Sequence, residues 1–292
     1  MSSAPDLPVV AVVGGGFSGT ALALHLKAFS AGKARIMVFE PRGRLGAGLA
    51  YSTTDSAHRI NVPAGRMSVY PDDPEDFLRY LTTTDEHVTD AELIGRDDQP
   101  YPRRLVFGDY VATEIAPLLS SGTVEHRQAE VTSVISSAQD WFVTDSTGRQ
   151  LRAQFVVLAA SHPSPALLRP FMPFRNHPKL VSDVTKPLAL DTIAPDDRVL
   201  ILGNGLTAAD VVASLEKRGH QGDIQSVSRR GLRSRGHAPV VQEPFGDFSS
   251  QPATTASTLL RSIRQSIEGA KAQGLTWHAV LDAVRGQAFA IW

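Results

Sequence analysis

The 292-residue sequence contains no cysteine. This absence excludes the flavoprotein disulfide reductases, whose chemistry needs a redox-active cysteine pair. It also excludes iron–sulfur clusters that are held by thiolates. Hydrophobic residues make up 42% of the chain and charged residues 20%, which is typical of a globular protein. The length is sufficient for two domains with a sizeable core.

Long apolar runs and a charge excess are missing as well. No stretch approaches the roughly 20 apolar residues that a membrane span requires. The net charge of −1 gives no reason to expect nucleic acid or an anionic membrane as a partner. Residues 1–6 lack the basic and apolar regions of a signal peptide, so we expect a short disordered lead and a cytoplasmic location. The sequence contains no HExxH motif that would indicate a metal site. We expect a small-molecule substrate.

Two glycine-rich segments each separate a short apolar stretch from an amphipathic one. The first fingerprint is Gly14-Gly15-Gly16-Phe17-Ser18-Gly19, and the second is Gly203-Asn204-Gly205-Leu206-Thr207-Ala208. The order strand, glycine turn, helix is typical of dinucleotide binding, because the glycines permit a tight turn and close approach of a pyrophosphate. The helix N-terminus adds free N–H groups and a partial positive charge. The sequence therefore predicts an α/β protein with two Rossmann-like modules, parallel sheets and a three-layer FAD/NAD(P)-binding fold.

The residue that follows each fingerprint at the tip of the next strand differs in charge. Glu40 lies 26 residues after Gly14, and Arg229 lies 26 residues after Gly203. An acid at this place accepts hydrogen bonds from ribose hydroxyls, whereas an arginine pairs with a 2′-phosphate. Arg230 follows directly, and a guanidinium suits the geometry of phosphate. These residues predict FAD in the first module and NADPH in the second.

The predicted cofactor-binding residues come from the two fingerprints and the segments after them. For FAD they are Gly14, Gly16, Phe17, Ser18, Gly19, Glu40, Arg44, Gly48, Asn61 and Val131, and for NADPH they are Gly203, Gly205, Leu206, Thr207, Arg229 and Arg230. Asn61 either contacts a ring edge or caps a turn. Val131 either meets adenine through its backbone or occupies a core strand position. No catalytic side chain is predicted, because hydride transfer between two cofactors needs no protein nucleophile.

Four other polar residues are considered as candidates for a functional role, and each also has a plain structural interpretation. Arg103 and Arg104 either clamp an acidic substrate or NADPH, or are solvated charges. His162, beside a proline-bounded turn, lies either near the flavin or in solvent. His58 is interpreted as a surface residue rather than as a base.

The patterning of the chain predicts the following organisation. We expect a FAD-binding domain at 1–163 and an NAD(P)-binding domain at 164–292, with a proline-rich linker over 163–197. The expected elements outside the two fingerprint units are a ligand-facing loop at 41–75, helices at 76–81 and 109–119, strands at 124–127, 131–136, 141–145 and 155–159, and helices at 256–273 and 277–284.

Segments 39–53, 58–68, 102–110 and 199–231 resemble bacterial FAD/NAD(P)-binding proteins of the YdhS-like group. Wider relatives are the flavin-containing and N-hydroxylating monooxygenases. The resemblance implies FAD, NADPH and an oxidoreductase that passes a hydride from NADPH to FAD and then oxygenates a small, amino-acid-like substrate. From their position after Glu40, we expect Arg44, Gly46, Gly48 and Tyr51 beside the diphosphate and flavin ring.

The chain departs from these relatives in two places. Ser161 stands where a glycine is common at the end of the flavin domain, which restricts the approach of backbone to flavin. The relatives are also longer, and we expect the segment that returns to their first domain to be missing here. A catalytically silent redox sensor that binds FAD and NADP(H) is the alternative, and an NADH-dependent enzyme is a third.

Overall fold

The computed structural model describes residues 7–238 and 240–291. The predicted N-terminal lead at 1–6 and the final residue lie outside the described residues. The chain divides into two compact units, Met1–Leu93 with Pro100–Leu232 and Ile94–Gln99 with Arg233–Trp292. The domain boundary expected near residue 163 falls inside the first unit and stays a prediction.

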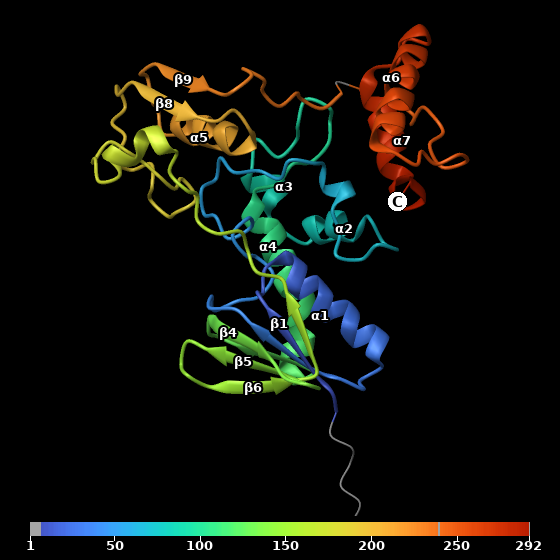
Figure 1. Ribbon diagram of the computed structural model, residues 1–292. Coiled ribbons are helices and arrows are strands. Elements are labelled where there is room, and N and C mark those ends of the chain that lie inside the picture. The colour runs from blue at the N-terminus through green and yellow to red at the C-terminus, as the bar shows by residue number, and fades with distance from the viewer. Residues whose placement is uncertain (1–6, 239, 292) are drawn as a thin grey trace, which may run out of the picture. The chain divides into compact units, whose positions relative to one another are not determined.

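The first unit is built on a parallel sheet of four strands in the order β3-β2-β1-β7 (Figure 1). The bounds are β1 Val9–Val13, β2 Arg35–Phe39, β3 Val124–Arg127 and β7 Phe155–Leu158. All neighbouring pairs in this sheet are parallel. The run of apolar residues in β1 and β2 suits strands that are covered on both faces.

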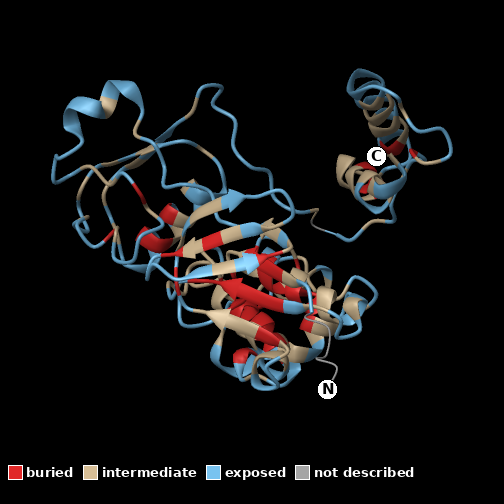
Figure 2. Ribbon diagram, turned by 60° about the horizontal axis from the view of Figure 1, so that its bottom comes forward, coloured by how far each residue is buried: buried red, intermediate tan, exposed pale blue. Residues whose placement is uncertain are grey.

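Two further layers cover this sheet, which confirms the predicted three-layer α/β fold. Helices α1 (Phe17–Ser30) and α4 (Arg104–Ser120) pack with Val10, Val12, Ile36 and Val38 on one face. The antiparallel sheet of β4 (Val131–Ser136), β5 (Trp141–Asp145) and β6 (Gln150–Ala153) packs with Ala11, Met37 and Phe39 on the other. Alternate residues of each strand thus point to opposite layers, and Figure 2 shows the buried residues concentrated along these elements.

The region between β2 and β3 departs partly from the prediction. Segment 41–75 is irregular apart from the short η1 (Ala64–Arg66), and α2 (Asp76–Thr82) and α3 (Glu86–Thr89) follow it. Helix α4 begins five residues before the predicted start at 109. Val106, Phe107, Tyr110 and Val111 supply its buried face, so packing outweighs the helix-weakening glycine at 108.

The second fingerprint also lies in the first unit, next to a smaller parallel sheet. Strands β8 (Val199–Leu202) and β9 (Ile224–Val227) flank α5 (Leu206–Lys217) and pair in parallel. Val211 and Leu215 of α5 pack against the inner side of these strands. Between β7 and β8 the described chain carries one short helix, η2 (Arg169–Phe174).

The second unit consists mainly of helices. Helix α6 (Ala256–Ala272) and α7 (Trp277–Gly286) pack through Ile263, Ile267 and Val280, and α8 (Ala288–Ile291) follows them. The side chain of Thr255 caps α6 by accepting a hydrogen bond from the Thr258 N–H at 3.2 Å. Across the described residues, no helix combines the length and apolarity needed to span a bilayer.

Candidate dinucleotide-binding sites

The first fingerprint forms a tight turn between β1 and α1. Gly14 has a φ of +105°, and its N–H donates to the Phe39 carbonyl at 2.9 Å, which ties the turn to the end of β2. Helix α1 starts after Gly16 without a side-chain cap and without an acid in its first turn. Its first N–H groups therefore have no capping side chain and present positive charge, as a phosphate-binding helix does.

Close packing explains why glycine stands at several of these positions. A Cβ at Gly14 would lie 2.4 Å from the Ala159 carbonyl oxygen, and one at Gly19 would lie 1.9 Å from the Gly14 carbonyl oxygen. A Cβ at Gly16 would come within 3.3 Å of the Gly48 Cα. The predicted FAD residues Gly16 and Gly48 thus face each other across a narrow gap.

Glu40 is bonded to the first glycine turn and is only 4% exposed. Its Oε2 accepts a hydrogen bond from the Gly15 N–H at 3.0 Å, and its Oε1 accepts from the Arg42 N–H at 3.0 Å and Nη1 at 3.1 Å. His126 Nε2 donates to the Glu40 carbonyl at 2.9 Å. A carboxylate offers about four acceptor positions, so these three hydrogen bonds leave about one of them for a further donor. The role of Glu40 towards a ribose stays a prediction.

The remaining predicted FAD residues are spread over several elements. Phe17 packs with Phe107 and Tyr51, at ring-centroid distances of 5.5 and 6.4 Å. Burial raises the pKa of Tyr51, and the charge of Arg104 opposes that shift only in part. Arg44 forms a partly exposed ion pair with Asp109 in the second turn of α4.

Asn61 and Val131 belong to segments other than the first glycine turn. Asn61 is exposed in a bend after Ile60. Val131 is half-buried, opposite Asp145 of β5, and packs in the layer between the two sheets. The core interpretation of the Val131 side chain is therefore satisfied, while its backbone role towards adenine stays a prediction.

A cleft of about 290 Å³ lies beside the ends of β2 and β7. Arg42, Leu49, Ser161, His162 and Lys186 are among the residues that line it. In open α/β sheets ligands bind outside the carboxyl ends of the strands, which is where Arg42 and Ser161 lie. His162 is exposed and lines this cleft, so it lies near the candidate FAD site and also in solvent.

The second fingerprint repeats the turn and leaves more space around it. Gly203 has a φ of +117°, and its N–H donates to the Val227 carbonyl at 2.8 Å. Gly205 precedes α5 without a side-chain cap, and a Cβ at Gly203 or Gly205 would meet nothing within 4 Å. This open space above a free helix N-terminus fits a dinucleotide diphosphate.

Arg229 and Arg230 are exposed and lie in a turn that is separated from the end of β9 by Ser228. The Gly231 N–H closes this turn by donating to the Ser228 carbonyl at 3.2 Å. Ser226 Oγ donates to Asn204 Oδ1 at 3.2 Å, which links β9 to the fingerprint itself. The donor set of the second site, two exposed guanidiniums beside an open glycine turn, fits a 2′-phosphorylated dinucleotide.

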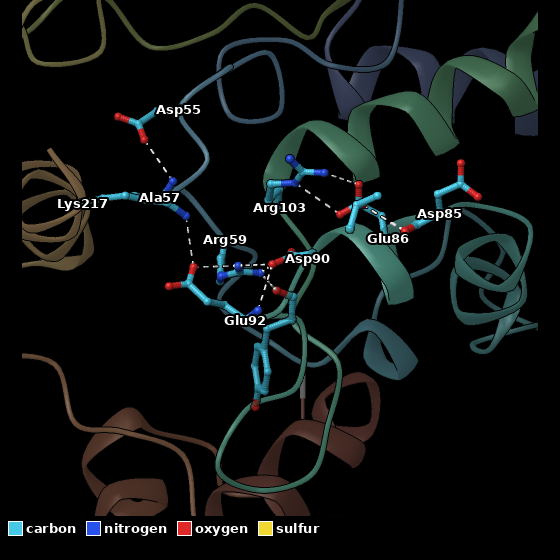
Figure 3. Close-up of polar contacts among 11 residues, drawn as sticks. Asp55, Ala57, Arg59, Asp85, Glu86, Asp90, Glu92, Arg103 and Lys217 are labelled. Atoms are coloured by element: carbon cyan, nitrogen blue, oxygen red, sulfur yellow. Dashed lines mark hydrogen bonds and ion pairs between the residues drawn. The ribbon is translucent and has the colours of Figure 1, made fainter.

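Arg103, Arg104 and His58 are bound to other protein groups, which sequence reasoning missed. Arg103 forms an ion pair with Glu86 and Arg104 with Asp210, and Figure 3 shows the first of these pairs. His58 lies between Thr53 and Ser214, with hydrogen-bond distances of 2.9 and 3.0 Å. The available signal was the recurrence of polar residues along one side of α5, described below.

The sequence model of the FAD-NAD(P)-binding family matches residues 11–163, which is more than half of the chain. The chain therefore belongs to the FAD-NAD(P)-binding family. This finding agrees with the predicted fold and with FAD and NADPH as cofactors. The narrower resemblance to the YdhS-like group stays a prediction.

No curated protein matches the chain. Among solved structures, the reduced form of ornithine hydroxylase (PvdA) from Pseudomonas aeruginosa is 19% identical, with a TM-score of 0.49, over 76% of this chain and 53% of that one. The open structure of cyclohexanone monooxygenase is 18% identical, with a TM-score of 0.49, over 76% and 40%. An oxidised steroid monooxygenase bound to NADP is 18% identical, with a TM-score of 0.49, over 75% and 38%. The chain thus spans about half or less of the length of these structures.

Proposed function

We propose that this protein is an NADPH-dependent flavoprotein oxidoreductase, with FAD at the first fingerprint and NADPH at the second. The observation that carries the proposal is the contrast between the two strand tips. Glu40 is a buried acid bonded to the glycine turn, whereas Arg229 is an exposed base beside Arg230. An acid selects ribose hydroxyls and an arginine pair selects a 2′-phosphate.

The protein's part in the reaction is binding, orientation and exclusion of water. The N-termini of α1 and α5 hold the two diphosphates, Glu40 holds the ribose of FAD, and Arg229 with Arg230 holds the 2′-phosphate. The aromatic cluster of Phe17, Tyr51 and Phe107 supplies an apolar wall behind the first turn. When bound, the two cofactors would supply the redox chemistry, which is hydride transfer from the nicotinamide to the flavin.

The finer proposal is that the reduced protein oxygenates a small, amino-acid-like substrate. It is supported by the resemblance of segments 39–53, 58–68 and 102–110 to relatives of that kind. The same resemblance supports membership of the YdhS-like group.

A visible spectrum of the purified protein, followed by anaerobic titration with NADPH, tests the proposed function. We expect a bound flavin whose visible absorbance disappears with one equivalent of NADPH. A flavin that binds but is not reduced by NADPH would instead identify a redox sensor. A protein that takes up no flavin after incubation with FAD would overturn the proposal.

A further inference from the structure

Helix α5 carries a polar stripe on one side. Asp210, Ser214, Lys217 and Arg218 recur at intervals of four, three and one residues, so their side chains share one face of the helix. Each of them contacts a residue between 53 and 104, far from α5 in the sequence. The neighbouring stripe of Val211 and Leu215 packs on the strands of α5's own module. The polar stripe therefore faces the FAD-binding module.

The strongest of these contacts is a two-bond ion pair between Arg104 and Asp210. Nη1 of Arg104 donates to Oδ2 at 2.8 Å and Nη2 donates to Oδ1 at 3.0 Å. Both side chains are only 20% exposed, so the pair is shielded from water. Arg104 Nε donates to the Arg59 carbonyl at 2.9 Å, which fixes the plane of the guanidinium. A two-bond pair of this kind fixes the relative orientation of the two side chains and also stabilises the contact.

His58 makes the second contact. Its Nε2 lies 3.0 Å from the hydroxyl of Ser214, which is fully buried, and its Nδ1 lies 2.9 Å from the Thr53 hydroxyl. Both ring nitrogens of His58 therefore lie within hydrogen-bond distance of a hydroxyl, one from Thr53 and one from α5. A buried serine at this place allows α5 to approach the imidazole closely.

The other contacts are more exposed and contribute less. Lys217 Nζ lies 3.1 Å from Glu92, which also accepts from Arg59, and Figure 3 shows this chain of charges. The side chain of Glu92 is 64% exposed, and exposed ion pairs contribute little to stability because water screens them. Arg218 and Asp55 are 3.7 Å apart.

Backbone hydrogen bonds around an isolated β-bridge between Arg59 and Arg103 support both strong contacts. The Arg104 N–H donates to the His58 carbonyl at 2.9 Å, and the Ile60 N–H donates to the Pro102 carbonyl at 3.1 Å. Arg104 is also the first residue of α4, and α5 begins directly after Gly205 of the second fingerprint. A shift of α5 along this contact therefore moves the second glycine turn with it.

We propose that Arg104–Asp210 and His58–Ser214, together named the α5 latch, set the distance and orientation between the two nucleotide sites. The latch residues are positioning residues, because they act through α5 and α4. The contacts described above between α5 and residues 53–104 are polar, and the two best shielded of them form the latch. The expected effect of the latch on the rate of flavin reduction rests on the proposed function. Its expected effect on the distance between the two modules does not.

The absence of cysteine makes the geometric test direct. Nitroxide labels at Ser137→Cys, between β4 and β5, and at Gln225→Cys, on β9, report the separation of the modules by pulsed electron paramagnetic resonance. We expect one narrow distance distribution for the parent protein, and a broader and shifted one after Arg104→Ala or Ser214→Ala. The matched control is Arg35→Ala, which breaks a two-bond ion pair with Glu125 inside the first module and leaves the distribution unchanged.

The kinetic test uses the FAD-loaded protein without oxygen. We expect Arg104→Ala to slow flavin reduction at saturating NADPH by roughly tenfold to a hundredfold, as expected for misplacement by about 1 Å. We expect the Kd values for FAD and NADPH to change little, because the latch side chains bond to protein groups. Arg104→Lys keeps the charge without the two-bond pair and gives an intermediate effect, and it serves if the alanine variant does not fold. In the double variant with Asp210→Ala, the two effects do not add.

The outcomes separate the latch from the proposed function. If distances and reduction rates stay as in the parent protein after Arg104→Ala and Ser214→Ala, the latch is overturned. A weaker Kd for NADPH with unchanged distances overturns it too, because the residues then act on binding. If NADPH does not reduce even the parent protein, the proposed function fails, while the distance measurement still decides the latch.

Discussion

The Glu40 carboxylate accepts a hydrogen bond from the Gly15 N–H at 3.0 Å, and this contact joins the tip of β2 to the middle of the first glycine turn. The two residues are 25 positions apart in the sequence. The acid that we assign to the ribose thus also holds the turn that we assign to the diphosphate. Arg229, the second residue after β9, is exposed.

Glu40→Ala is expected to lower the stability of the protein before any cofactor binds. The change leaves a buried Gly15 N–H without its acceptor, which costs about 1–3 kcal/mol. Urea unfolding measures the loss. The control is Glu125→Ala, whose pair with Arg35 is 40–48% exposed and is expected to contribute below about 1 kcal/mol. Equal losses for the two variants would contradict the assigned role of Glu40 in the turn.

Gly205→Ala is expected to weaken NADPH binding and to leave the folded protein as stable as before. Gly205 has a φ of −89°, and its Cβ would meet nothing within 4 Å, so alanine fits the backbone. The methyl group would enter the space that we assign to the diphosphate, and we expect the Kd for NADPH to rise by roughly tenfold, or about 1.4 kcal/mol. Calorimetric titration measures the Kd. Gly236→Ala, also with free space around it, is the control that leaves the Kd unchanged.

Arg229→Ala is expected to distinguish the two nicotinamide cofactors. Loss of a guanidinium partner weakens NADPH by roughly tenfold and NADH by less than about twofold, because only NADPH carries the 2′-phosphate. The Kd values of both cofactors are compared in the variant and in Arg261→Ala, an exposed arginine on α6. An equal effect on NADH and NADPH would show that Arg229 does not contact that phosphate.

Acid is expected to weaken the first unit through Asp90. Burial acts to raise the pKa of its carboxyl, but hydrogen bonds and the charge of Arg59 outweigh burial and hold it below the ordinary value of 3.8. A carboxyl whose pKa is lowered by folding stabilises the fold above the unfolded pKa, and this contribution disappears as the pH falls through the folded pKa. We expect stability to fall below about pH 4.

Asp90→Asn should flatten this pH dependence, measured by urea unfolding between neutral pH and pH 3. Near neutral pH the variant is expected to be less stable by about 1–3 kcal/mol, because Arg59 loses a charged partner. Asp72→Asn, at an exposed position, is the control. An Asp90→Asn variant with the same acid dependence as the parent protein would contradict the role of this pair.

The glycine turns and the succession of strand, helix and strand along the chain were predictable because they depend on local pattern. The spacing from Gly14 to Glu40 requires one strand, one helix and a second strand, and β1, α1 and β2 follow that order. The three-layer architecture follows from the apolar strands and from the alternating pattern of β4 and β5. Helix α4 begins earlier than its pattern indicated, since tertiary packing of Phe107 outweighed the local effect of Gly108.

The polar contacts of α5 were not predictable from the sequence. Arg104 and Asp210 are 106 residues apart, and nothing in the local pattern links them. Arg103 and Arg104 are adjacent in the sequence, yet the former pairs with Glu86 and the latter with Asp210. Only the folded backbone shows that the interpretation of these arginines as solvated charges was incomplete.

A crystal structure of the protein grown with FAD and NADP⁺ tests the central claim most directly. The account predicts FAD with its diphosphate at the start of α1 and a ribose hydroxyl on Glu40, and NADP⁺ with its 2′-phosphate on Arg229 at the start of α5. Exchange of the two cofactors between the sites, or electron density for neither cofactor at one of them, would contradict it.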